Sequence, residues 1–72
     1  MDTYASFKQR SDAIRLTAFL KDIRIASTII NTPDHIGGGC GLSVLFSNYY
    51  ADGVRKIINE RNLKSFIGIF YK

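Results

Sequence analysis

The sequence has very few of the residues that small proteins use for covalent or metal-based stabilisation. Cys40 is the only cysteine and His35 the only histidine among the 72 residues. A single cysteine forms no intrachain disulfide, which excludes a disulfide-rich secreted mini-protein. One Cys and one His are too few ligands for a structural zinc site. We therefore expect no metal site, and a reducing, cytoplasmic environment.

Long apolar runs are also absent. The longest lies at residues 67–71 and is interrupted by Gly68, whereas a helix that spans a bilayer needs about 20 mostly apolar residues. The first ten residues include Asp2 and several other polar residues where a signal peptide would have its apolar segment. We therefore expect neither a membrane segment nor a signal peptide.

Length and composition favour one small folded domain over residues 1–72. Hydrophobic residues make up 46% of the chain and charged residues 22%, as in ordinary globular domains. A chain this short buries only about 60% of the surface that it exposes when unfolded. That leaves no room for a cofactor-sized cleft between two domains, so we expect a protein that is not an enzyme and holds no cofactor.

The net charge of +4 raises the question of nucleic-acid binding. The basic residues are spread along the whole chain, however, and only Arg55 and Lys56 are adjacent. Charge distributed in this way is typical of a solvated surface. Base stacking on a sheet would use aromatic residues such as Tyr4, Phe7 and Phe46, but the basic and aromatic signature of RNA-binding strands is missing. The sequence therefore disfavours a nucleic-acid partner.

The apolar pattern alternates between strand-like and helix-like segments. Ala13, Leu16 and Leu20 recur at intervals of three and four, which is typical of the buried stripe of a helix. Ser11 is expected to cap this helix, and Asn62 to end a second one in a left-handed conformation. The expected elements are a strand at 3–7, a helix at 11–22, strands at 25–31 and 42–46, a helix from 47 or 48 to 61, and a strand at 64–71.

The order strand, helix, strand, strand, helix, strand predicts an α+β fold. Two split crossovers of this kind in a short chain are typical of a ferredoxin-like βαββαβ sandwich. We expect a four-stranded antiparallel sheet with both helices on one face. The first and third strands should be central, and the second and fourth should form the edges.

The most unusual segment joins the second and third strands. It begins at Thr32-Pro33 and contains Gly37-Gly38-Gly39-Cys40-Gly41, and it is longer than most hairpin loops. A thiol among glycines has no neighbouring side chains to shield it. His35 could supply a nearby cation, and successive glycine N–H groups could stabilise an anion. The alternative is that Cys40 is an inert, small hydrophobic residue in a simple connection.

Several motifs along the chain are similar to those of one family of small bacterial proteins. The matching residues are Phe7 at the end of the first strand, Ala13 in the first helix, Thr32-Pro33, Cys40-Gly41-Leu42, and the closing Ile67-Gly68-Ile69-Phe70-Tyr71-Lys72. On these motifs the chain resembles the selenium/sulfur carrier-like proteins over nearly its whole length. The most specific element is Thr-Pro followed at a short distance by Cys-Gly-Leu.

The resemblance implies that Cys40 is the reactive residue, a carrier thiol that holds sulfur or selenium as a persulfide or perselenide. It also implies a protein partner, such as a cysteine desulfurase or a selenium/sulfur acceptor, and no cofactor. The chain departs from the family's usual pattern at Asn31, Asp34 and Leu45, where Pro, Arg and Arg are usual. The expected loop-support residues are Thr32, Pro33, His35, Gly39 and Gly41.

A second function, from a different class, is a small regulatory or protein-interaction module with no cysteine chemistry. Ferredoxin-like domains often associate through their edge strands, and fold alone does not choose among their functions. The β-branched segment at 25–30 is expected at such an edge and could add to a partner's sheet. On this hypothesis the protein is a homodimer that does not depend on Cys40.

Overall fold

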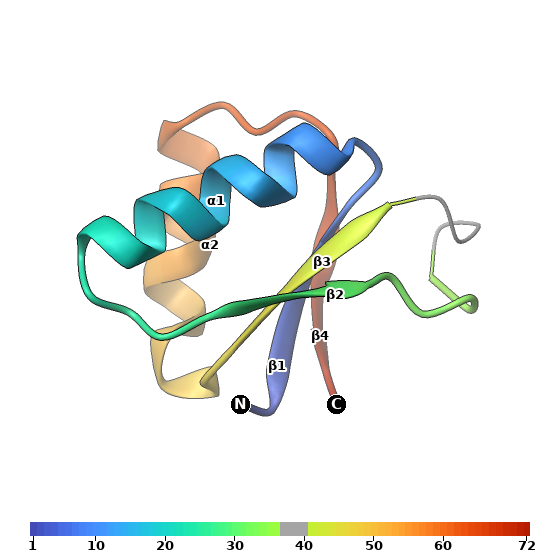
Figure 1. Ribbon diagram of the computed structural model, residues 1–72, viewed down its shortest axis with the longest axis horizontal. Helices are drawn as coiled ribbons and strands as arrows, with labels where there is room; N and C mark the ends of the chain where they lie inside the picture. The colour runs from blue at the N-terminus through green and yellow to red at the C-terminus, as the bar shows by residue number, and fades with distance from the viewer. Residues whose placement is uncertain (37–40) are drawn as a thin grey trace.

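The structure is a computed structural model that describes residues 1–36 and 41–72. Its element order is the βαββαβ order expected from the sequence (Figure 1). A short 3-10 turn precedes the second helix. The elements are β1 (Thr3–Phe7), α1 (Arg10–Asp22), β2 (Thr28–Asn31), β3 (Leu42–Phe46), the 3-10 turn (Asn48–Tyr50), α2 (Ala51–Glu60) and β4 (Phe66–Tyr71).

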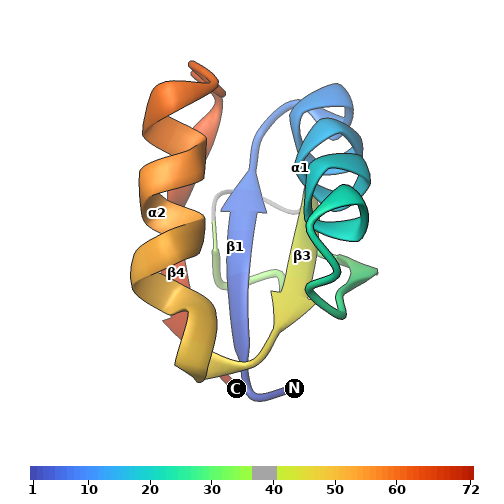
Figure 2. The same cartoon turned by 90° about the vertical axis from the view of Figure 1, so that its left-hand side faces the viewer.

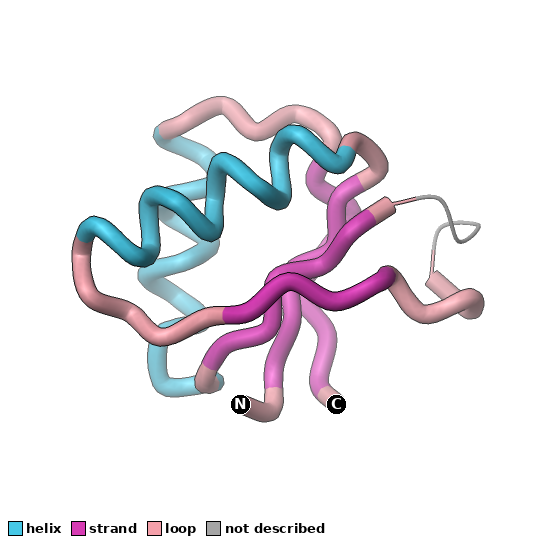
Figure 3. Tube along the Cα trace, viewed as in Figure 1, coloured by secondary structure: helices cyan, strands magenta, loops and turns pink. Residues whose placement is uncertain are grey.

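The strands form one antiparallel sheet in the order β2-β3-β1-β4. The prediction that β1 and β3 are central and β2 and β4 are edges is confirmed. Figure 3 shows the strands fanning apart toward the ends of the chain, as expected for a twisted sheet. In the register, Ser6 pairs with Ser43 on one side and with Gly68 on the other. A bulge between Ser6 and Phe7 shifts the pairing with β4.

Both helices pack on one face of the sheet, as predicted. Figure 2 views the molecule from the helix side, with α1 over β3 and α2 over β4. Because side chains alternate across a strand, every second residue of the central strands points at the helices. The shared core consists of Ala5, Phe7, Ala13, Leu16, Leu20, Val44, Phe46, Val54, Ile58 and Leu63.

The other face of the sheet has a smaller apolar cluster. Tyr4 and Leu45, from the two central strands, are buried there together with Ile36. Ile36 belongs to the connection between β2 and β3, so that connection folds back over the sheet. Burial of Tyr4, Phe7 and Phe46 also means that none of these aromatic side chains offers an exposed face for base stacking.

Four predicted element starts are wrong. The second helix was expected to begin at residue 47 or 48, but residues 48–50 form the 3-10 turn and α2 begins at Ala51. The other three differences each have a physical reason. Helix α1 begins at Arg10, and Gln9 rather than Ser11 is its N-cap; the backbone N–H of Gln9 donates to Ser65 Oγ at 3.1 Å. Strand β4 begins at Phe66 rather than at residue 64, because Ser65 is engaged in hydrogen bonds with Gln9 and Asp12.

The third difference is that β2 begins at Thr28 rather than at residue 25. After α1 the chain turns through Arg24, whose φ of 63° is left-handed. The backbone N–H of Ile25 donates to the carbonyl of Leu20 at 2.9 Å, which closes the helix end. Ile25 then packs against the core instead of joining the sheet. At the end of α2, Asn62 is left-handed, with a φ of 60°, as predicted.

Among residues 1–36 and 41–72, no helix is long and apolar enough to cross a membrane.

Candidate functional site

The connection between β2 and β3 carries every site residue predicted from the sequence. The structure describes residues 32–36 and Gly41 of this connection. The predicted carrier thiol Cys40 and the predicted support residue Gly39 lie outside the described residues. The pairing of Cys40 with His35 is therefore not described either. What the structure does define is the base of the connection, where the chain leaves β2 and enters β3.

The base is closed by hydrogen bonds of Thr32. Its backbone N–H donates to the carbonyl of Gly41 at 3.3 Å, which joins the two ends of the connection directly. The hydroxyl of Thr32 lies 2.9 Å from Ser43 Oγ in β3. Thr32 is only 5% exposed, so these bonds are shielded from competing water. The two ends of the connection are thus fixed to each other and to the sheet.

The hydroxyl of Ser43 continues this contact across the sheet. Ser6 Oγ in β1 lies 2.7 Å from Ser43 Oγ, so Thr32, Ser43 and Ser6 form a continuous chain of buried hydroxyls. Burying a hydroxyl without a partner is costly, and here each satisfies its neighbour. This chain was not predicted from the sequence. The sequence pattern that could have indicated it is a single serine in each of two apolar strands that pair with each other.

Gly41 brings the start of β3 unusually close to the end of β1. A β carbon on this residue would lie 1.8 Å from the carbonyl oxygen of Phe7 and 2.9 Å from its carbonyl carbon. Both atoms belong to the backbone, so no side-chain rotation relieves the overlap. Only glycine fits, and the base of the connection depends on this contact.

The first part of the connection forms a turn. The N–H of Ile36 donates to the carbonyl of Pro33 at 2.9 Å. Pro33 is half-buried, whereas Asp34 and His35 at the tip of the turn are exposed. Ile36 is only 6% exposed and packs against Tyr4 and Leu45. The turn therefore holds His35 in solvent, while its next residue anchors the chain to the sheet.

The base of the connection has no strong charge of its own. The one ion pair among the described residues joins Arg15 and Asp12 on α1. The described residues also contain no group of three or more His, Cys, Asp or Glu side chains that could hold a metal ion. Hydrogen bonds and close backbone packing therefore define this base.

Comparison with protein families supplies the remaining finding. Residues 2–66 match the model of the family described as "Putative Se/S carrier protein-like". The chain belongs to this family. The match extends from the residue before β1 to the first residue of β4 and so includes the whole connection. A search of curated proteins and a search of solved structures found no match.

Membership in this family gives the chain a functional context. The family's description names selenium and sulfur as the cargo of a carrier, and a carrier works with other proteins that load and unload it. Of the residues predicted from the sequence, the structure brings Thr32 and Gly41 together at the base. It places Pro33 and His35 in the adjoining turn.

Proposed function

We propose that the protein is a non-enzymatic carrier that holds sulfur or selenium on Cys40 as a persulfide or perselenide. The donor is an enzyme of the cysteine desulfurase class, and the acceptor is a second thiol-bearing protein. Family membership supports the cargo. The observation that carries the proposal is the closed base formed by Thr32 and Gly41, which gives the Cys40 segment a fixed origin on the sheet.

The transfer is a thiol exchange at sulfur. The Cys40 thiolate attacks the outer sulfur of the donor's persulfide, and the S–S bond of the donor breaks. The donor cysteine leaves as a thiolate, and the transferred sulfur keeps its proton in the new Cys40 persulfide. No oxidant or reductant is consumed. In delivery, the acceptor's thiolate attacks the outer sulfur of the Cys40 persulfide, and Cys40 leaves as a thiolate. Transfer of selenium through a perselenide balances in the same way.

Placement of the connection suits this role. Its described part lies at the side of the molecule away from the helices (Figure 1), and its base is fixed by backbone contacts. A carrier needs a reactive group that can enter a partner's active site while the rest of the domain keeps its shape. Holding both ends of a connection also lowers the entropy lost when it binds.

The two charged side chains of the turn would act on the Cys40 thiolate in opposite ways. His35 in its protonated form would favour a nearby thiolate, and Asp34 would oppose it. Both side chains are exposed at the same turn. We propose that His35, together with backbone N–H groups, gives the net stabilisation of the thiolate.

The test is the pH dependence of Cys40 alkylation by iodoacetamide, with Cys40→Ser as the blank. We expect a thiol pKa below the reference value of about 8.5. His35→Gln should move that pKa upward, because the variant lacks the cation. A wild-type pKa at or above the reference, with slow labelling, would contradict the proposed thiol activation.

A second candidate is an interaction module that pairs through the β2 edge. β2 is a short edge strand, and Ile29 in it is 38% exposed. Unpaired edges of this kind add to partner sheets. A concentration-dependent dimer that persists in Cys40→Ser and is lost in Ile29→Lys would favour this candidate over the carrier.

A further inference from the structure

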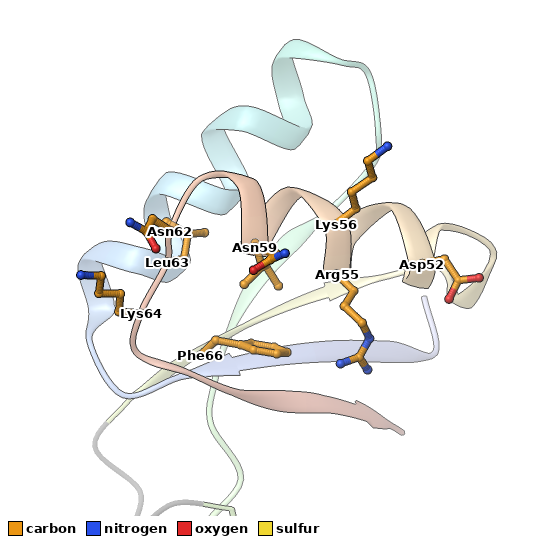
Figure 4. A pocket seen from close by; sticks show the side chains of 9 residues that line it. Asp52, Arg55, Lys56, Asn59, Asn62, Leu63, Lys64 and Phe66 are labelled. Carbon is orange, nitrogen blue, oxygen red and sulfur yellow. The ribbon is translucent and has the colours of Figure 1, made fainter.

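A groove separates α2 from the start of β4 on the surface of the molecule (Figure 4). Its volume is about 610 Å³, and it is open to solvent along its length. The carrier chemistry proposed for Cys40 makes no use of it. We call it the α2–β4 groove. The residues that give it its chemistry are Arg55, Lys56, Asn59, Asn62, Lys64 and Phe66.

The α2–β4 groove is predominantly basic. Arg55, Lys56 and Lys64 line it, and Asp52 is the only acidic residue of its lining. Within residues 1–36 and 41–72 the one ion pair lies on α1, so these cations have no carboxylate within salt-bridge distance. In Figure 4, Arg55 hangs from α2 toward β4, and Lys64 lies toward the opposite end of the groove.

The neutral residues of the α2–β4 groove suit a ligand that carries apolar groups as well as anionic ones. The amide side chain of Asn59 lies between Arg55 and Lys64, and that of Asn62 lies at the Lys64 end of the groove. Both can donate hydrogen bonds to an anion. Phe66 forms its floor and is half-buried. Its ring packs on Phe7, with 5.7 Å between the ring centroids, so the floor is fixed by the core.

The backbone at the end of the α2–β4 groove is also well defined. Asn62 has a left-handed φ of 60°, and the N–H of Leu63 donates to the carbonyl of Ile58 at 3.1 Å. Leu63 is buried in the main core. This tight helix end determines where the backbone of Lys64 lies relative to α2. The cations of the groove therefore come from α2 and from the connection that is held against its end.

One end of the α2–β4 groove lies at the same end of the sheet as the base of the Cys40 connection. Phe66 pairs with Phe7 in the sheet, and the carbonyl of Phe7 is the group in close contact with Gly41. The backbone N–H of Lys8 also donates to the carbonyl of Ser65 at 2.9 Å. A molecule bound in the groove would thus lie at the end of the sheet where the connection begins, on the other side of β1 from Gly41.

We propose that the α2–β4 groove binds an acidic segment of the protein that exchanges cargo with Cys40. This inference rests on the proposed function. Carboxylates of the segment pair with Arg55 and Lys64, and an apolar side chain packs on Phe66. Charge complementarity of this kind accelerates association and orients partners. Docking here would hold the partner at the end of the sheet from which the Cys40 connection starts.

An acidic protein segment fits the observations better than the other anionic ligands. An open groove buries too little of a small molecule, because small-molecule sites enclose most of their ligand. RNA binding draws on many phosphate contacts and on exposed aromatic faces. The groove offers only three cations, and the aromatic residues Tyr4, Phe7 and Phe46 of the central strands are buried.

The test uses a short synthetic peptide of glutamates with a central phenylalanine, labelled with fluorescein. Binding is measured by fluorescence anisotropy and by shifts of backbone amide NMR signals. We expect shifts centred on Arg55, Asn59, Lys64 and Phe66, and an affinity that falls as salt is added. Arg55→Glu combined with Lys64→Glu should weaken binding at least about tenfold. Both residues are exposed, so the fold should be retained.

The matched control combines Lys21→Glu with Arg24→Glu. It changes the net charge by the same amount but lies at the C-terminal end of α1, outside the lining of the groove. We expect it to change binding less than about twofold, because exposed charges at a distance are largely screened. An equal loss in the control, or no binding of the peptide to the wild type, would overturn the proposal.

Two further measurements separate this inference from its alternatives. A single-stranded oligouridine that binds more tightly than the peptide would replace the acidic segment with RNA and overturn the proposal. Cys40→Ser should bind the peptide as the wild type does. If the peptide binds the groove but Cys40 accepts no sulfur, the proposed carrier function is wrong and the proposed binding of an acidic segment is retained. If Cys40 is loaded but the peptide does not bind, only the groove proposal fails.

Discussion

At the scale of single residues, Gly41 and Gly53 have opposite surroundings. A β carbon on Gly41 would collide with the backbone of Phe7, whereas a β carbon on Gly53 would meet nothing within 4 Å. Gly53 lies inside α2, where glycine is less favourable than alanine by about 1 kcal/mol. The same substitution should therefore have opposite effects at the two positions.

We expect Gly41→Ala to destabilise the protein by about 2–3 kcal/mol, because overpacking against fixed atoms forces the strands to move. The control Gly53→Ala should stabilise it by about 1 kcal/mol. Urea unfolding followed by circular dichroism measures both. A Gly41→Ala variant as stable as the wild type would show that β1 and β3 can separate at this point without loss.

The contact of Gly41 also shows a limit of sequence reasoning. The sequence showed a glycine after the only cysteine, and the resemblance assigned it a supporting role. It did not show which atoms a side chain would meet, because Phe7 is far away in the chain. By contrast, the chain of hydroxyls through Ser6 and Ser43 was within reach of prediction. Both lie in correctly predicted strands, and the expected topology already paired those strands.

At the scale of elements, Asp12 joins the first turn of α1 to the segment before β4. Its Oδ2 accepts hydrogen bonds from Ser65 Oγ at 2.6 Å and from the Ser65 N–H at 3.0 Å. Asp12 is nearly buried, and a carboxylate in the first turn of a helix also interacts favourably with the helix dipole. One side chain thus sets the positions of two elements.

Asp12→Ala should destabilise the protein by about 1–3 kcal/mol, because it leaves the Ser65 N–H without its partner in a partly buried site. Asp22→Ala is the matched control, since Asp22 is exposed in the last turn of the same helix. It should change stability by no more than about 0.5 kcal/mol. Thermal unfolding of the two variants checks this, and equal effects would contradict the role of Asp12.

These contacts explain which parts of the elements could be predicted. The existence and order of helices and strands depend on local periodicity, which the sequence displays. Their ends depend here on Ser65, which binds both Gln9 and Asp12. No local pattern reports a hydrogen bond between residues so far apart in the chain, so Ser11 and residue 64 were wrong choices for element ends.

At the scale of the whole molecule, the two faces of the sheet are covered by different parts of the chain. The helix face holds the main core, and the opposite face is closed by Ile36 from the connection. The residues at the base of the connection are therefore packed as part of the folded domain. The sequence predicted this architecture because the order of elements allows few topologies.

The α2–β4 groove could not be predicted in the same way. Arg55 lies in α2 and Lys64 in the connection that follows it, and their spacing in the sequence does not show that they line the same groove. They line one groove only because the tight turn at Asn62 returns the chain beside α2. The groove and the base of the Cys40 connection lie on the two sides of Phe7 in β1, whose ring packs on Phe66 and whose carbonyl lies against Gly41.

The carrier function depends on one step, in which Cys40 accepts sulfur from a partner. The most direct measurement is the intact mass of the protein after incubation with a cysteine desulfurase and L-cysteine. Because Cys40 is the only cysteine, any persulfide has one place to form. The account predicts the added mass of one sulfur atom on the wild type, its removal by dithiothreitol, and no added mass on Cys40→Ser. An unchanged wild-type mass, or the same gain on Cys40→Ser, would contradict it.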